Sequence, residues 1–132
     1  MIKTEMSTNA AYMILWGEIM MVRHFLDVEE VTSLKGANGV SKRTLLGKGE
    51  SAPNFYLRRF RIEAGGNTPQ HAHPWEHEIY VLSGSGTVMV EGEEAAMREG
   101  VAVLIPTGQE HQIRAGSETL EFICIIPAVE EY

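Results

Sequence analysis

The chain has 132 residues, of which 44% are hydrophobic and 22% charged, and its formal net charge is −7. This length allows one domain and excludes two independent hydrophobic cores. The acidic surplus argues against a phosphate-binding surface, so we expect no nucleic-acid partner. With one cysteine, Cys124, no intrachain disulfide can form. This excludes a disulfide-stapled secreted fold and indicates a cytoplasmic protein.

Residues 1–21 are expected to form an N-terminal extension. Their apolar run is broken by Glu18, which makes it too interrupted to span a bilayer, and it lacks a signal-peptide cleavage pattern. We therefore expect no membrane partner. Two interpretations of the extension stay open. It is an arm or helix that packs on the body or on a second subunit, or it precedes a natural start at Met20 or Met21.

The main domain, residues 22–132, has the pattern of an all-β fold. Short β-rich runs alternate with glycine, proline and asparagine, and strands about ten residues apart with turns between them predict a sandwich or barrel. The segment His24–Leu34 fits either a helix or an opening strand. The expected strands are Asn54–Glu63, Glu78–Leu82, Gly86–Glu91, Val101–Ile105, His111–Ala115 and Thr119–Ile126.

The last of these runs is apolar on both sides. Because strand side chains alternate, one face carries Leu120, Phe122, Cys124 and Ile126, and the other carries Ile123 and Ile125 beside Glu121. An apolar outer face left uncovered promotes aggregation. We therefore expect this face to meet another sheet or a second subunit, which favours a homodimer.

The histidines are the most informative residues of the chain. There are five, and three of them, His71, His73 and His77, lie within seven residues. On an extended chain, His71 and His73 point to the same side, close enough to bind one metal ion. Pro74 separates them from His77, so the chain is expected to turn there and bring His77 back on the next strand.

A fourth histidine, His111, opens a later strand. Three ligands close in sequence and one distant ligand can build a metal site across a barrel. A lone histidine is more often solvent-exposed or helix-capping, and His24 is interpreted in that way. The other four predict one divalent ion held by His71, His73, His77 and His111.

Two motifs in the chain resemble those of the cupin superfamily. The family's first motif, G-x5-H-x-H-x3–4-E-x6-G, is matched from Gly65 through His71 and His73. Its second motif, G-x5-P-x-G-x2-H-x3-N, is matched at Gly100, Pro106, Gly108 and His111, with Ala115 at the final asparagine. The resemblance covers about residues 40–127. It implies an all-β double-stranded β-helix, or jelly-roll, barrel.

The segment HAHPWEHE is similar to that of a subgroup of small single-domain prokaryotic cupins. In that subgroup a fourth histidine replaces the motif's glutamate, and manganese is the metal. Both His77 and Glu78 satisfy the spacing of the motif's glutamate. The motif then places six residues before its final glycine, and the interval from Glu78 to Gly84 is one residue shorter than that. Adjacent strand residues face opposite sides, so only one can reach the ion. The resemblance favours His77.

The identity of the metal follows from the resemblance and not from the ligands. Imidazole suits zinc, copper, iron and nickel, and manganese binds most weakly in the usual order. Four protein ligands on a six-coordinate ion would leave two positions for water, dioxygen or a chelating substrate. A structural zinc site would instead be closed and tetrahedral.

Three further residues are candidates for the pocket. The resemblance places Phe122 and Cys124 on the inward face near the metal, although a buried cysteine usually only packs the core. Alternation on the run Leu57–Arg61 separates Arg58 from Arg59 and Arg61. Arg58 is the candidate for binding a substrate carboxylate, and the other two are expected at the surface.

These features favour a metal-dependent oxidoreductase, dioxygenase-like, that acts on a small organic substrate. The alternatives are a non-catalytic module that binds a small ligand or metal, and a structural metal site in a dimerising scaffold. The inward faces look mainly apolar, with Arg58, Gln70 and Gln109 as polar candidates. The sequence therefore predicts either a small, largely apolar substrate or weak specificity, and the reaction is inferred from the resemblance alone.

Overall fold

The computed structural model describes residues 2–6, 11–15 and 18–129, and it describes side chains from residue 20 onward. These residues form strands, turns and two short 3-10 helices, η1 (Phe25–Asp27) and η2 (Lys48–Glu50), with no α-helix among them. No described helix is long and apolar enough to cross a membrane. The expectation of an all-β fold is confirmed.

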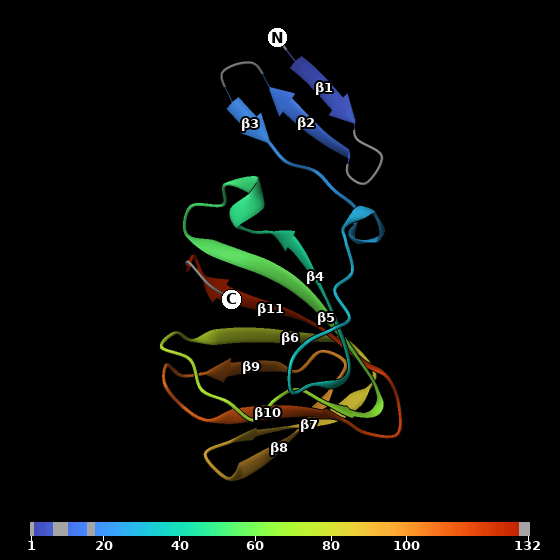
Figure 1. Cartoon of the computed structure of the whole chain (residues 1–132), viewed down its shortest axis with the longest axis vertical. Coiled ribbons are helices and arrows are strands. Elements are labelled where there is room, and N and C mark those ends of the chain that lie inside the picture. Colours follow the sequence, from blue (N-terminus) through green and yellow to red (C-terminus); the bar gives the residue numbers. More distant parts are fainter. Residues whose placement is uncertain (1, 7–10, 16–17, 130–132) are drawn as a thin grey trace.

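The first three strands form a sheet of their own. They are β1 (Ile2–Met6), β2 (Ala11–Leu15) and β3 (Glu18–Met20), paired antiparallel in that order. Figure 1 shows this sheet in blue at the N-terminal end of the long axis. The sequence left open whether an ordered extension is an arm or a helix. Its described residues form strands and no helix.

The segment from His24 to Leu34 is neither the helix nor the strand that the sequence allowed. It contains η1 and then a single β-bridge between Val31 and Lys42. His24 caps η1, because its Nδ1 accepts a hydrogen bond from the Leu26 backbone N–H at 3.1 Å. The interpretation of His24 as a helix-capping histidine is confirmed.

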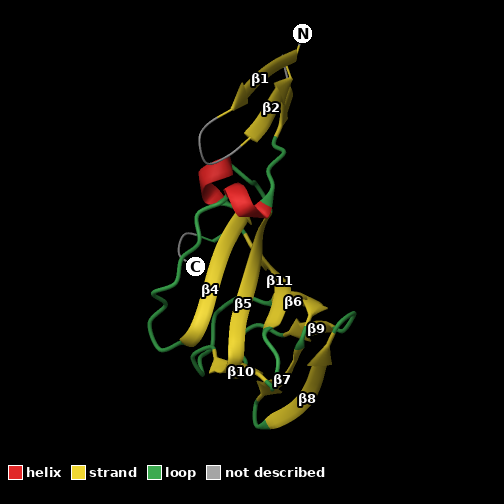
Figure 2. Cartoon of the chain, turned by 90° about the vertical axis from the view of Figure 1, so that its right-hand side faces the viewer, coloured by secondary structure: helices red, strands yellow, loops and turns green. Residues whose placement is uncertain are grey.

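The main sheet has eight antiparallel strands that curl into a barrel (Figures 1 and 2). Seven of them follow the order β8-β7-β10-β5-β11-β6-β9, and β4 pairs with the other edge of β5. The strands are β4 (Asn38–Leu46), β5 (Phe55–Asn67), β6 (His77–Ser83), β7 (Ser85–Val90), β8 (Glu93–Arg98), β9 (Ala102–Ile105), β10 (His111–Ala115) and β11 (Leu120–Pro127).

Six of these strands correspond to the runs expected from sequence, and β4 and β8 were missed. Strand β8 reads EEAAMR and lacks the β-branched and aromatic residues typical of strands. The turn before it is the pair Glu91 and Gly92, whose φ angles are 49° and 81°. Two successive positive φ angles make a tight hairpin turn. Glu93 therefore already belongs to the strand and faces Val90.

The core lies on the inner face of the barrel. Leu120, Phe122, Cys124 and Ile126 of β11 are each no more than 3% exposed, as the alternation in the sequence predicts. Each of these residues pairs with a residue of β5 that also faces inward. Phe122 lies opposite Phe60, and Cys124 lies opposite Arg58. This register brings Arg58 into the barrel.

The outer face of β6, β9 and β11 carries an open apolar groove of about 440 Å³. Tyr80 and Leu104 on this face are 52% and 58% exposed, and Ile123 and Ile125 of β11 also line the groove. The described part of the chain therefore leaves this apolar face uncovered.

Candidate functional site

Two segments far apart in sequence are joined at the mouth of the barrel. His71 and His111 form an isolated antiparallel bridge, in which each backbone N–H donates to the other's carbonyl at 3.1 and 2.8 Å. The buried Thr68 strengthens this junction, because its hydroxyl accepts a hydrogen bond from the Ile113 N–H at 2.9 Å. Side chains of such a bridge lie on the same face of the sheet. Both imidazoles therefore face the barrel interior.

His73 is positioned by its backbone and by its ring. Its carbonyl accepts a hydrogen bond from the Gly108 N–H at 2.8 Å. Gly108 has a φ of 78° within a turn closed by Gln109 and Pro106, a conformation that favours glycine. The His73 ring stacks on Trp75 with centroids 4.6 Å apart and planes only 3° from parallel. The proline–glycine turn of the second motif thus supports a histidine of the first motif.

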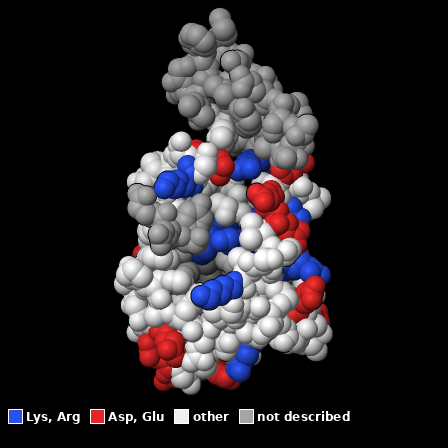
Figure 3. Space-filling model, viewed as in Figure 1, with Lys and Arg blue, Asp and Glu red and all other residues white. Residues whose placement is uncertain are grey.

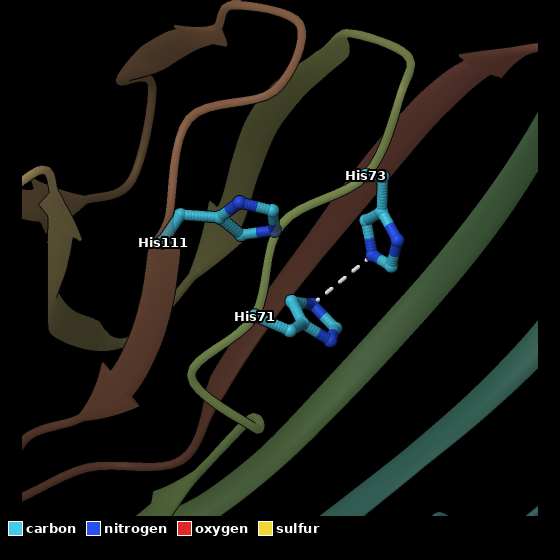
Figure 4. Close-up of side chains that lie close together, drawn as sticks. All are labelled: His71, His73 and His111. Carbon is cyan, nitrogen blue, oxygen red and sulfur yellow. Dashed lines mark hydrogen bonds between the residues drawn. The ribbon is translucent and has the colours of Figure 1, made fainter.

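Three histidines form a compact group. The nearest ring nitrogens of His71, His73 and His111 all lie within 4.8 Å of one another, and Figure 4 shows their rings turned toward a common point. The Nε2 atoms of His71 and His73 are 3.2 Å apart. Two imidazoles on one ion at ordinary bond lengths have nitrogens about 2.9–3.4 Å apart. The spacing therefore matches two ligands of a single ion.

His77 lies next to this group but outside its 4.8 Å limit. It opens β6, is 6% exposed, and its ring centroid is 4.7 Å from that of His111 and 5.2 Å from that of His73. Its Nδ1 is buried without a hydrogen-bond partner. The neighbouring Glu78 is exposed on the outer face and borders the outer groove. His77 therefore lies on the side of β6 that faces the other three histidines, and its role as a ligand stays a prediction.

The imidazoles are held in the neutral form that binds metal. Burial, followed by the positive charge of neighbouring histidines and of Arg58, lowers the pKa of His71 to about 4 and that of His77 to about 3. The pKa of His73 is lowered in the same direction, mainly by burial. These rings are therefore unprotonated at neutral pH and need not release a proton to bind an ion.

His111 is oriented by a neighbour in the chain. Its Nδ1 lies 3.0 Å from the carbonyl oxygen of Gln109. If Nδ1 carries the proton, it donates to this carbonyl, which fixes the ring and leaves Nε2 with a free lone pair. A backbone carbonyl in this position is a common outer partner of a metal-binding histidine.

The histidines line a cavity of about 270 Å³ in the barrel. Arg58 and Cys124 also line it, as the sequence predicts, and the Arg58 Nη2 donates to the Cys124 sulfur at 2.9 Å. Burial raises the pKa of the Cys124 thiol, an effect that Arg58 opposes. Phe60 forms part of the wall.

Other sequence candidates lie elsewhere. Phe122 does not line the cavity, because it stacks behind Phe60 with ring centroids 5.2 Å apart. Gln70 is exposed and donates to Glu110 at 2.6 Å, and Gln109 contributes its backbone and does not line the cavity. Arg59 pairs with Glu121 on the outer face.

The sequence interpretation missed two cationic side chains, Lys42 and Lys35, that also line the cavity. Lys42 follows the buried Val40 by two residues on β4, so strand alternation would have found it had β4 been recognised. Lys35 is exposed in the loop before β4 and has no periodic signal. The lining is mainly apolar, as expected, but it carries two cations beyond the predicted Arg58.

Comparison with known proteins agrees with this architecture. The family model of the cupin domain matches residues 58–126, which include all four clustered histidines. The chain belongs to the cupin family. This cupin also resembles the polyketide cyclase RemF of Streptomyces resistomycificus. Their structures superpose with a TM-score of 0.78 at 32% identity, over 86% of this chain and 83% of RemF.

Two curated relatives are similar in sequence. Dimethylsulfoniopropionate lyase DddW of Ruegeria pomeroyi is 34% identical over 104 residues, which span 75% of this cupin and 68% of the lyase. The tetracenomycin polyketide synthase protein TcmJ of Streptomyces glaucescens is 31% identical over 77 residues, or 57% of this cupin and 52% of TcmJ. The similarity thus extends to proteins named for different reactions.

The residues of this site fit a divalent ion. The donors are imidazoles, one of them with a buried nitrogen that has no hydrogen-bond partner, and the described residues that line the cavity include no carboxylate. Such a donor set suits transition metals such as zinc, iron, copper or nickel better than magnesium or calcium, which prefer oxygen ligands.

Proposed function

We propose that this cupin is a metal-dependent enzyme that acts on a small organic substrate, and that its reaction is a dioxygenase-like oxidation. The observation that supports this most strongly is the convergence of four histidines and a buried arginine on one cavity of about 270 Å³. His71, His73 and His111 would hold the ion, and His77 would complete the set. By resemblance the ion is manganese, with iron, nickel, zinc or copper as the alternatives.

The residues of the chain divide the work of the site. A bound ion would supply Lewis-acid or redox chemistry at positions left open by the four histidines. Ile79, Ile105 and Ile113 line the cavity and limit the access of water. Arg58 presents a fixed positive charge that orients a substrate, and Cys124 holds that guanidinium through its sulfur.

The absence of an acidic side chain in the described lining bears on the type of reaction. Proton abstraction by a carboxylate is a common enzymatic device, and no Asp or Glu of the described cavity wall is placed for it. This favours redox chemistry over carboxylate-assisted acid–base chemistry. A cavity that binds a small ligand without turnover would have the same wall, so the binding module remains the second candidate.

Oxygen uptake separates these two candidates. We expect manganese- or iron-loaded protein to consume dioxygen with at least one member of a panel of diketones, catechols and alkenes, and zinc-loaded protein to consume none. The His71→Ala, His111→Ala double variant is the control for free metal in solution. If no redox-active metal gives turnover with any substrate, the enzyme proposal fails and the binding module takes its place.

We also propose that two copies of this cupin pair through the outer apolar groove. Leu104→Glu should convert the dimer to a monomer, because it places a charge on an apolar face that would otherwise be buried. Leu26→Glu is the matched control, since Leu26 is 64% exposed on η1, away from the groove. Light scattering during gel filtration measures the mass. A wild-type monomer, or a dimer unaffected by Leu104→Glu, would refute the pairing.

The proposed location is the cytoplasm. Cys124 is the one cysteine of the sequence and it is free. This arrangement suits a reducing compartment.

A further inference from the structure

The arginines of this chain differ sharply in their partners. Five of them make ion pairs with glutamates at distances up to 3.8 Å: Arg23, Arg43, Arg59, Arg61 and Arg114. Arg58 has no carboxylate partner among the described residues, although the chain holds 18 acidic residues against 11 basic ones. Arg98 also has no carboxylate partner among the described residues, but it is exposed on β8, where water solvates its charge. Arg58 is buried, and in a chain with so many glutamates a buried arginine without one points to a ligand that supplies the negative charge.

Arg58 is also the most buried of these arginines. It is 7% exposed, its Nε is buried without a hydrogen-bond partner, and its Nη2 donates only to the Cys124 sulfur. Its guanidinium lies over the Phe60 ring, with Cζ 5.0 Å from the centroid. A thiol is a weak acceptor, and a guanidinium offers five donors. A buried charge with so few hydrogen-bond partners lowers the stability of the fold. An anionic ligand bound to the guanidinium would offset this cost.

Two lysines increase the positive charge of the same cavity. Lys42 of β4 faces Phe60, while its neighbour on that face, Thr44, faces Arg58, so Lys42 and Arg58 are diagonal neighbours. The pKa of Lys42 is lowered, first by burial and then by Arg58. Lys35 lines the cavity from its exposed loop. Figure 3 shows a hollow on this face with Lys and Arg atoms above and below it.

The cavity has a polar end and a cationic side. The histidines come from the start of β10, the segment before β6 and the first residue of β6, whereas Arg58 and Lys42 come from β5 and β4. Its volume of about 270 Å³ is below the range of roughly 300–1,000 Å³ typical of ligand pockets. A ligand that spans both ends must therefore be small and carry a negative group at the arginine.

We propose that the substrate of this cupin is a small organic carboxylate whose carboxylate group binds Arg58 and is supported by Lys42. The planar guanidinium can bind both carboxylate oxygens at once, which a point charge cannot do. That this ligand is a substrate rests on the proposed function. The preference of the cavity for an anion does not depend on that function. The sequence analysis named Arg58 as the candidate for this role, and the structure adds Lys42 beside it.

Three probes of one shape and different charge test this inference: benzoate, benzamide and benzamidine. Calorimetry on the metal-loaded protein should show benzoate binding about tenfold to a hundredfold more tightly than neutral benzamide, the range expected for a charge-assisted hydrogen-bonded pair. Cationic benzamidine should show no binding. Equal affinity for benzoate and benzamide would overturn the inference.

Variants assign the preference to Arg58 and not to the ion. Arg58→Gln should abolish the preference for benzoate at unchanged metal content, whereas Arg61→Gln, on the outer side of the same strand, should preserve it. Arg58→Lys keeps the charge and should retain part of the preference, which guards against misfolding of the glutamine variant. A preference that survives Arg58→Gln would place the anion on the metal and refute the inference. A preference that is intact without any turnover would instead refute only the enzyme proposal.

Discussion

Replacing His71 and His111 together by alanine should remove the divalent ion from the purified protein. The bridge between these residues places both imidazoles on one face and within ligand distance of His73. The double variant leaves only His73 and His77, too few donors to hold an ion against dilution. We expect about one ion per chain in the wild type and less than about one tenth of that in the variant, as measured by elemental analysis.

Single variants of the other histidines complete this experiment. His24→Ala is the matched control, because His24 caps η1 and lies outside the cluster, and its metal content should equal that of the wild type. His77→Ala should weaken metal binding without abolishing it, since the remaining trio stays intact. Full metal content in the double variant would contradict the assignment of the site.

Gly84→Ala should be the most damaging single substitution outside the cluster. Gly84 joins β6 to β7 with a φ of 86°, and an added Cβ would overlap the carbonyl oxygen of Thr119. Backbone cannot move aside as a flexible side chain can, so the hairpin must shift away from the start of β11. We expect a loss of more than about 4 kcal/mol in the free energy of unfolding, or no soluble protein.

Gly92→Ala separates the two causes of this loss. Gly92 has a similar φ of 81°, but an added Cβ meets no atom within 4 Å. It should cost only the left-handed backbone penalty of about 1–2 kcal/mol. Urea unfolding of both variants provides the comparison. Equal losses in the free energy of unfolding for the two variants would show that the close approach of Gly84 to Thr119 does not add to the cost of the substitution.

Gly84 also bears on the choice between His77 and Glu78. Counted from Glu78, the family's x6-G spacing ends one residue beyond Gly84, but counted from His77 it ends at Gly84. The glycine is required by geometry, because this turn needs both a positive φ and a close approach. The spacing therefore favours His77, and not Glu78, as the residue that occupies the glutamate position of the motif.

Local patterns were sufficient to predict much of the site. The His71–x–His73 spacing and strand alternation predict imidazoles on a common side, and alternation around Arg58 predicts one inward arginine of three. The faces of β11 followed from the same period. These features depend on backbone geometry over a few neighbouring residues. Such local geometry can be predicted from the order of the residues alone.

Features that depend on strand pairing were not accessible in this way. Strand β4 is rich in polar residues, and β5 is the one described strand with which it pairs. Its inward lysine therefore had no visible reason to lie in the barrel. Phe122 and Phe60 share a face, and only the register decides which of them lines the cavity. The two lysines of the site therefore emerged only from tertiary structure.

The central claim is that one ion is held by four histidines beside Arg58. Anomalous diffraction from crystals of the manganese-loaded protein tests it most directly. The account predicts one strong peak per chain, within about 2.0–2.3 Å of nitrogens of His71, His73, His77 and His111. A peak bound by a Glu78 oxygen, or one outside the cavity, would contradict it.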